Sequence, residues 1–159
     1  MNTINDIFSF PNPANEIAAR FVAGMVLILT TVIILTENQI LAGFLVYGFL
    51  ARVATGPTLS PMGLLATRVI VPALGNLEKP VAGPPKRFAQ TVGLVFSTTA
   101  FVMLWLDLVL AFQITLTILA VFAALESIAG FCAGCFVFAY LMKWGLIPES
   151  VCESCMIQV

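Results

Sequence analysis

Histidine is absent from this chain of 159 residues, and charged residues make up only 9% of it. The lack of histidine excludes imidazole general bases, haem ligation by histidine and mixed Cys/His metal sites. The few charges are 7 basic and 8 acidic residues, so the chain has no basic face for phosphate and we expect no nucleic-acid binding. A Ser–His–Asp set cannot form, and hydrolytic catalysis of that kind is not expected.

What the chain has in abundance is apolar surface. Hydrophobic residues make up 60% of it, and its mean hydropathy is +1.06. A soluble domain of this size could not bury that much apolar surface, because small domains have too much surface for their volume. The composition therefore excludes a soluble globular domain and a disordered chain, and predicts a small integral membrane protein.

Four apolar runs are candidates for membrane spans, since about 20 helical residues cross roughly 30 Å of hydrocarbon. We expect the spans at residues 17–35, 39–53, 88–106 and 108–128. The second run is short and needs a snorkelling Arg52 to reach the interface. Short turns separate the first span from the second and the third from the fourth. The predicted fold is therefore an all-α membrane protein with four transmembrane helices arranged as two hairpins.

The long segment between the two hairpins is rich in proline and glycine. Within it, Ser60 followed by Pro61 has the pattern of an N-cap and a first helical residue. An apolar face follows, so we expect an interfacial helix over residues 61–71.

The basic residues predict the orientation of the spans. Five lie in the loop between the hairpins, one precedes the first span and one follows the fourth, and the two turns have none. In chain order they are Arg20, Arg52, Arg68, Lys79, Lys86, Arg87 and Lys143. The positive-inside rule places both termini and the loop in the cytoplasm. Lys86 and Arg87 are expected to anchor the chain at anionic headgroups. Residues 1–20 lack a basic n-region, so we expect no signal peptide.

The four cysteines form two C-x-x-C pairs, Cys132 with Cys135 and Cys152 with Cys155. Both lie in the predicted cytoplasmic end, residues 129–159, where structural disulfides are uncommon. Their spacing falls in the range of a four-thiolate zinc site. The alternative is thiol–disulfide exchange, which a C-x-x-C at a helix N-terminus favours. A third interpretation is packing alone, because cysteine is a small apolar residue of buried helices.

Glu126 interrupts the fourth apolar run. An ionisable residue inside a membrane is a candidate proton or ion site. Its position near the cytoplasmic end favours a simpler interpretation, in which it pairs with Arg87, Lys86 or a backbone donor.

Gly130 and Gly134 form a G-x-x-x-G motif at the end of that run. Either glycine is a candidate for a kink. The motif allows two helices to approach closely, within one chain or between two copies in a homo-oligomer.

Three strings in the chain carry a family resemblance: SPMGLL at residues 60–65, GPPKRFAQ at 83–90 and FCAGC at 131–135. Together they resemble domain-of-unknown-function family 4395, whose members are small bacterial membrane proteins. The resemblance extends from about Asn15 to Cys155. It implies a multi-pass protein of the bacterial inner membrane and a thioredoxin-like or sulfurtransferase-like partner. It implies no established activity.

We therefore expect a membrane protein whose two C-x-x-C pairs form a cytoplasmic-side thiol site for redox chemistry or sulfur transfer. The alternative is a structural or accessory subunit of a larger membrane complex, with a four-cysteine zinc site and no catalysis. Zinc is the one cofactor that the spacing suggests.

Overall fold

The structure is a computed structural model, and it describes residues 10–148. Two short strands and a series of helices make up this part of the chain. In order they are β1 (Ala14–Asn15), α2 (Glu16–Thr36), α3 (Gln39–Thr55), α4 (Pro61–Leu65), η1 (Ala66–Ile70), α5 (Val71–Ala73), β2 (Pro80–Val81), α6 (Gly83–Trp105), α7 (Val109–Ala124), η2 (Leu125–Ala129) and α8 (Ala133–Lys143). The segments η1 and η2 are π-helical.

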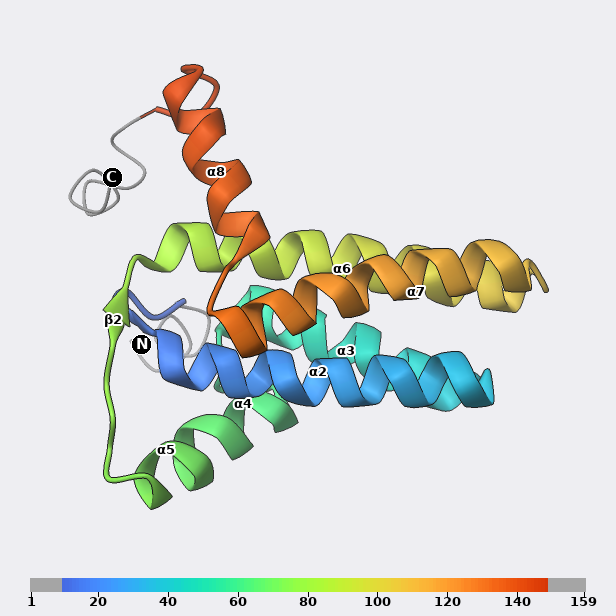
Figure 1. Ribbon diagram of the computed structural model, residues 1–159, viewed down its shortest axis with the longest axis horizontal. Coiled ribbons are helices and arrows are strands. Elements are labelled where there is room, and N and C mark those ends of the chain that lie inside the picture. The colour runs from blue at the N-terminus through green and yellow to red at the C-terminus, as the bar shows by residue number, and fades with distance from the viewer. Residues whose placement is uncertain (1–9, 149–159) are drawn as a thin grey trace, which may run out of the picture.

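The long helices form two hairpins, α2 with α3 and α6 with α7, that lie side by side with both turns at the same end (Figure 1). Glu37 and Asp107 reverse the chain at these turns with φ values of 51° and 57°. The Asn38 side chain then caps α3 by accepting from two backbone N–H groups. The tight turns that the sequence predicts are thus built from single residues in the left-handed region.

Three of the helical segments are long and apolar enough to cross a membrane: Glu16–Thr36, Gly83–Trp105 and Val109–Ala129. The second expected span, residues 39–53, corresponds to α3, which has 17 residues. At 1.5 Å per residue it is only about 25 Å long, somewhat less than a hydrocarbon core. The structure therefore supports a helical membrane protein with three candidate spans among the described residues.

The bundle has a small apolar interior and an apolar exterior. Ile33, Leu45 and Phe112 are almost completely buried where the two hairpins meet. By contrast, Leu35 and Ile40 are 78% and 82% exposed. A soluble protein rarely leaves large side chains like these uncovered in such numbers, whereas lipid tails solvate them.

The opposite end of the bundle holds the connecting segments. Strands β1 and β2 pair antiparallel, with Ala14 opposite Val81, and so join the start of α2 to the start of α6. The helix expected at 61–71 is present as a continuous run of α4, η1 and α5. Its Ser60 side chain accepts from the Gly63 N–H, and Pro61 is its first residue, as the sequence predicts.

Helix α8 leaves the bundle axis and crosses α6 at a steep angle (Figure 1). Gly130, with φ of 68°, ends η2 and lets the chain change direction, so of the two candidate glycines it is the one at the break. Gly134 serves close packing: a Cβ there would lie 2.6 Å from the Cβ of Ala89 on α6. The G-x-x-x-G motif is thus used within the chain.

Candidate functional site

A cavity of about 210 Å³ lies where α8 meets the bundle. Apolar side chains of α2, α3, α6, α7 and α8 form most of its wall. The polar side chains that line it are Arg52, Gln90, Glu126 and the thiol residue Cys132. This combination of an apolar wall with a few convergent polar groups is typical of a small-molecule site.

Cys132 and Cys135 lie at the start of α8. Cys132 is the N-cap residue, and its Sγ accepts a hydrogen bond of 3.3 Å from the backbone N–H of Cys135. Both are free cysteines and both are partly buried. A sulfur at the N-cap position accepts hydrogen bonds from backbone N–H groups and lies at the positive end of the helix dipole. Both interactions favour its anionic form.

The two thiols titrate in opposite directions. The pKa of Cys132 lies below its usual range, chiefly because the Cys135 side chain donates a hydrogen bond to it; Lys86 and the Cys135 backbone N–H add to this. Burial and the Glu126 carboxylate oppose the shift. The pKa of Cys135 is raised by the same hydrogen bond and by burial. Cys132 is therefore the more acidic thiol of the pair, and Cys135 is the less acidic one.

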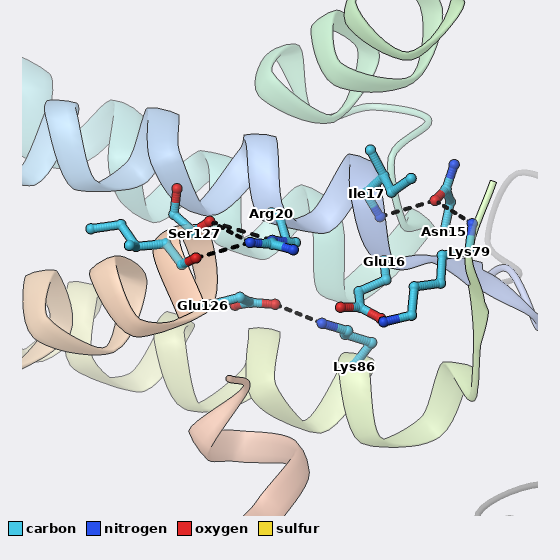
Figure 2. A network of polar contacts seen from close by, with 9 residues as sticks. Asn15, Glu16, Ile17, Arg20, Lys79, Lys86, Glu126 and Ser127 are labelled. Atoms are coloured by element: carbon cyan, nitrogen blue, oxygen red, sulfur yellow. Dashed lines mark hydrogen bonds and ion pairs between the residues drawn. The ribbon is translucent and has the colours of Figure 1, made fainter. Parts of the chain in front are cut away.

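Glu126, in the π-helical segment η2, pairs with Lys86 near the start of α6 (Figure 2). The Lys86 Nζ donates to Oε1 of Glu126 at 2.7 Å, and Lys86 is only 6% exposed. The Lys86 ammonium therefore lies inside the protein rather than at the lipid headgroups where the sequence places it. Arg87 is exposed, and its Nε donates to the Val53 carbonyl oxygen.

Arg20 holds the end of η2 against α2 (Figure 2). Its guanidinium donates to the carbonyl oxygens of Ser127 and Ile128, the second at 2.9 Å. These are final carbonyls of a helix, where a cation is favourable. Arg20 thus fixes the position from which the chain enters the C-x-x-C.

Arg52 is almost completely buried, with 4% of its surface exposed. Its Nε donates to Oε1 of Gln90 at 2.7 Å and its Nη1 donates to Oγ of Ser60 at 3.1 Å. The guanidinium carbon lies 4.4 Å from the centre of the Phe49 ring. Its Nη2 is buried and has no hydrogen-bond partner among residues 10–148. An unpaired donor of this kind is costly, and native proteins rarely tolerate one without a reason.

A second, smaller cavity of about 90 Å³ adjoins the first. Three residues, Val22, Arg52 and Gln90, line both cavities. The Arg52 side chain is therefore part of the wall between the two spaces.

A family model described as a domain of unknown function (DUF4395) matches residues 14–143. The chain belongs to this family. No curated protein and no solved structure matches the chain. The DUF4395 match includes Cys132 and Cys135 and every residue that lines the larger cavity.

The second cysteine pair, Cys152 and Cys155, lies outside the described residues. The four-cysteine zinc site and any thiol exchange between the two pairs therefore stay predictions. Within residues 10–148 no group of three or more candidate metal ligands comes together.

The sequence did not point to Arg52, Ser60 and Gln90 as parts of one site. It predicted that Arg52 reaches outward to the interface, whereas the residue turns inward to a polar cluster. The sequence signal that could have indicated this site was Gln90, a polar residue near the start of an apolar span of this DUF4395 chain.

Proposed function

We propose that Cys132 and Cys135 form a dithiol/disulfide couple that exchanges electrons with the thiols of a partner protein at the membrane surface. The observation that carries this proposal is the position of Cys132 as the N-cap of α8, with Sγ accepting from the Cys135 N–H. This is the arrangement in which a C-x-x-C thiol is most reactive.

The exchange follows from the different acidities of the two thiols. The Cys132 thiolate attacks one sulfur of a partner disulfide, and the other partner sulfur leaves as a thiolate. Cys135 then loses its proton and attacks the Cys132 sulfur, which releases the second partner thiolate. The chain gains one disulfide and loses two electrons, and the partner disulfide is reduced by the same two electrons. The reverse sequence oxidises a partner dithiol.

A thioredoxin-like protein is the partner class that this chemistry suits, and a sulfurtransferase-like protein is the second. Either would present a reactive cysteine to the start of α8. The pair Cys152 and Cys155 is, on this proposal, a further thiol pair in the same compartment.

We also propose that α3 completes a four-span topology with both termini in the cytoplasm of a bacterial cell. The support is the pairing of the helices into two hairpins whose turns share one end of the bundle (Figure 1). The turns carry no Lys or Arg, whereas the opposite end holds the basic residues.

The aromatic side chains of α8 support a position at the lipid–water boundary. Phe131, Phe136, Tyr140 and Trp144 contact one another in sequence, with ring centres 4.8–6.1 Å apart, and all are at least 43% exposed. Tyrosine and tryptophan are enriched at that boundary. The thiols at the start of the helix would then face the aqueous side of the membrane.

Thiol trapping tests the proposed couple. Cells expressing the protein are quenched with acid, and free thiols are alkylated with a mass-shifting maleimide in a variant in which Cys152 and Cys155 are Ser. We expect Cys132 and Cys135 to be found in both dithiol and disulfide forms, and purified reduced protein to reduce an added thioredoxin-type disulfide. Thiols that stay reduced and never exchange would refute the couple.

A metal assay keeps the zinc alternative separate. Stoichiometric zinc in the purified full-length protein, lost when Cys152 and Cys155 are replaced, would indicate a closed thiolate site in place of exchange.

A further inference from the structure

The larger cavity brings together a reactive thiol and a buried arginine with an unused donor. Cys132 and Arg52 both line it, although they come from α8 and α3. Arg52 is 4% exposed, and its Nη2 has no partner among the described residues. A ligand in this cavity with an acceptor oxygen within reach of that donor would satisfy it, inside the same space that Cys132 lines.

The charge arrangement favours a ligand on which negative charge develops. Glu126 is neutralised by Lys86 at 2.7 Å. The hydrogen-bond partners of Arg52 are the neutral side chains of Gln90 and Ser60. The positive charge of Arg52 therefore has no carboxylate bonded to it. In an apolar wall this charge interacts strongly with electron density arriving on a ligand oxygen.

The rest of the cavity wall is apolar, and the cavity has room for one ring. Side chains such as Phe49, Val92 and Phe122 line the space of about 210 Å³. A cavity of about 150 Å³ holds benzene. The site therefore accommodates one substituted six-membered ring, and any long tail has to extend outward between the helices toward the lipid.

We propose that this cavity binds the ring of a lipid-soluble quinone, which accepts the electrons of the Cys132–Cys135 dithiol. This inference rests on the proposed function, because it names the electron acceptor of the same thiol pair. The two thiols lose two protons and two electrons and form one S–S bond. The quinone gains these protons and electrons and becomes a quinol. Arg52 donates to the quinone oxygen that becomes negative during the transfer.

Photolabelling with an azido-ubiquinone tests binding at the cavity separately from redox turnover. We use the full chain in detergent and locate the crosslink by mass spectrometry. The label is expected on peptides that line the cavity, and excess decylubiquinone is expected to compete it away. The Cys135→Ala variant is expected to label like the parent, since Cys135 does not line the cavity, but to form no intramolecular disulfide and reduce no quinone.

Two variants of α6 provide a matched pair. Val92→Trp fills the cavity and is expected to lower both labelling and quinone reduction at least about tenfold, the effect of losing a contact worth about 1.4 kcal/mol. Val95→Trp places the same side chain at a 60% exposed position outside the cavity and is expected to stay within about twofold of the parent. Arg52→Met is expected to reduce labelling by a similar factor as Val92→Trp, with folding checked by its Tm.

The outcomes separate the two proposals. Absent cavity labelling, or equal labelling of the Val92→Trp and Val95→Trp variants, would overturn the quinone site whether or not thiol exchange occurs. Labelling that oleate displaces and decylubiquinone does not would assign the cavity to a fatty acid and also overturn it. Specific labelling without quinone reduction by the reduced parent would leave a quinone-binding site but overturn the quinone as electron acceptor. If thiol exchange were also absent, the thiol couple would be refuted as well.

Discussion

The Lys86 ammonium lies 2.7 Å from the Glu126 carboxylate, and the two side chains are 8% and 15% exposed. This pair connects the first turn of α6 to η2, which ends three positions before Cys132, the first residue of the C-x-x-C motif (Figure 2). It therefore orients the short segment from which the thiol helix starts. Because Lys86 also lowers the pKa of Cys132, the same ammonium acts on the position and on the acidity of the sulfur.

Replacing Lys86 by Met is expected to destabilise the protein by about 3 kcal/mol, because it leaves the Glu126 carboxylate buried without a partner. The double variant Lys86→Met with Glu126→Leu is expected to recover most of that loss, since no unpaired charge remains. Unfolding followed by Tm and by denaturant titration in detergent measures both. A double variant no more stable than the single one would show that the pair does not act as a unit.

Replacing Cys135 by Ala is expected to slow the alkylation of Cys132 at neutral pH. The change removes the side-chain hydrogen bond that contributes most to the low pKa of Cys132, so a smaller fraction of that sulfur is thiolate. Cys135→Ser, which keeps a donor, is expected to react faster than Cys135→Ala. The rates at which iodoacetamide alkylates Cys132 are compared over a range of pH, in proteins in which Cys152 and Cys155 are replaced by Ser.

The direction of the pH dependence follows from the lowered pKa. The alkylation rate of Cys132 in the parent should fall as the pH drops through that pKa, with a midpoint below the usual pKa of a cysteine thiol. A midpoint at or above the usual pKa of a cysteine thiol would contradict the proposed role of Cys132 as the nucleophile.

Gly134→Ala is expected to cost about 1–3 kcal/mol and to change the reactivity of Cys132. The new Cβ would lie 2.6 Å from the Cβ and 2.7 Å from the Cα of Ala89, so the start of α8 has to move away from α6. Gly43→Ala is the matched control, because its Cβ would be 3.7 Å from the nearest atom, a ring carbon of Phe101. The control is expected to be neutral or slightly stabilising. Equal Tm values for the two variants would argue against close α6–α8 packing.

Single cysteines at the two hairpin turns test the four-span topology. In a variant that lacks the native cysteines, Asn38→Cys and Asp107→Cys are both expected to react with a membrane-impermeant maleimide added to intact spheroplasts. Arg68→Cys, in the loop between the hairpins, is expected to react only after the membrane is permeabilised. Protection of Asn38→Cys in intact spheroplasts would show that the α2–α3 turn does not lie on the outer side of the membrane. The chain would then have fewer than four spans.

Local patterns predicted the helices well because local forces decide them. The Ser60–Pro61 start of the third helical segment and the turn at Asp107 depend on capping and on backbone preference. The predicted pairing of Glu126 with a neighbouring cation is confirmed by the Lys86–Glu126 ion pair, since a carboxylate in an apolar run needs such a partner. The burial of Arg52 and Lys86 was not predictable in this way. The positive-inside rule states on which side of the membrane a basic residue lies, and it does not state how deeply the side chain is buried in the protein.

The sequence by itself determined that this chain is helical, apolar and divided into two hairpins, because each of those properties is set within about 20 consecutive residues. It also placed two thiols one helical turn apart. Only the tertiary structure decided that Cys132 meets Arg52 and Gln90 around one cavity, since these residues are separated by 38 to 80 positions and come together only through helix packing.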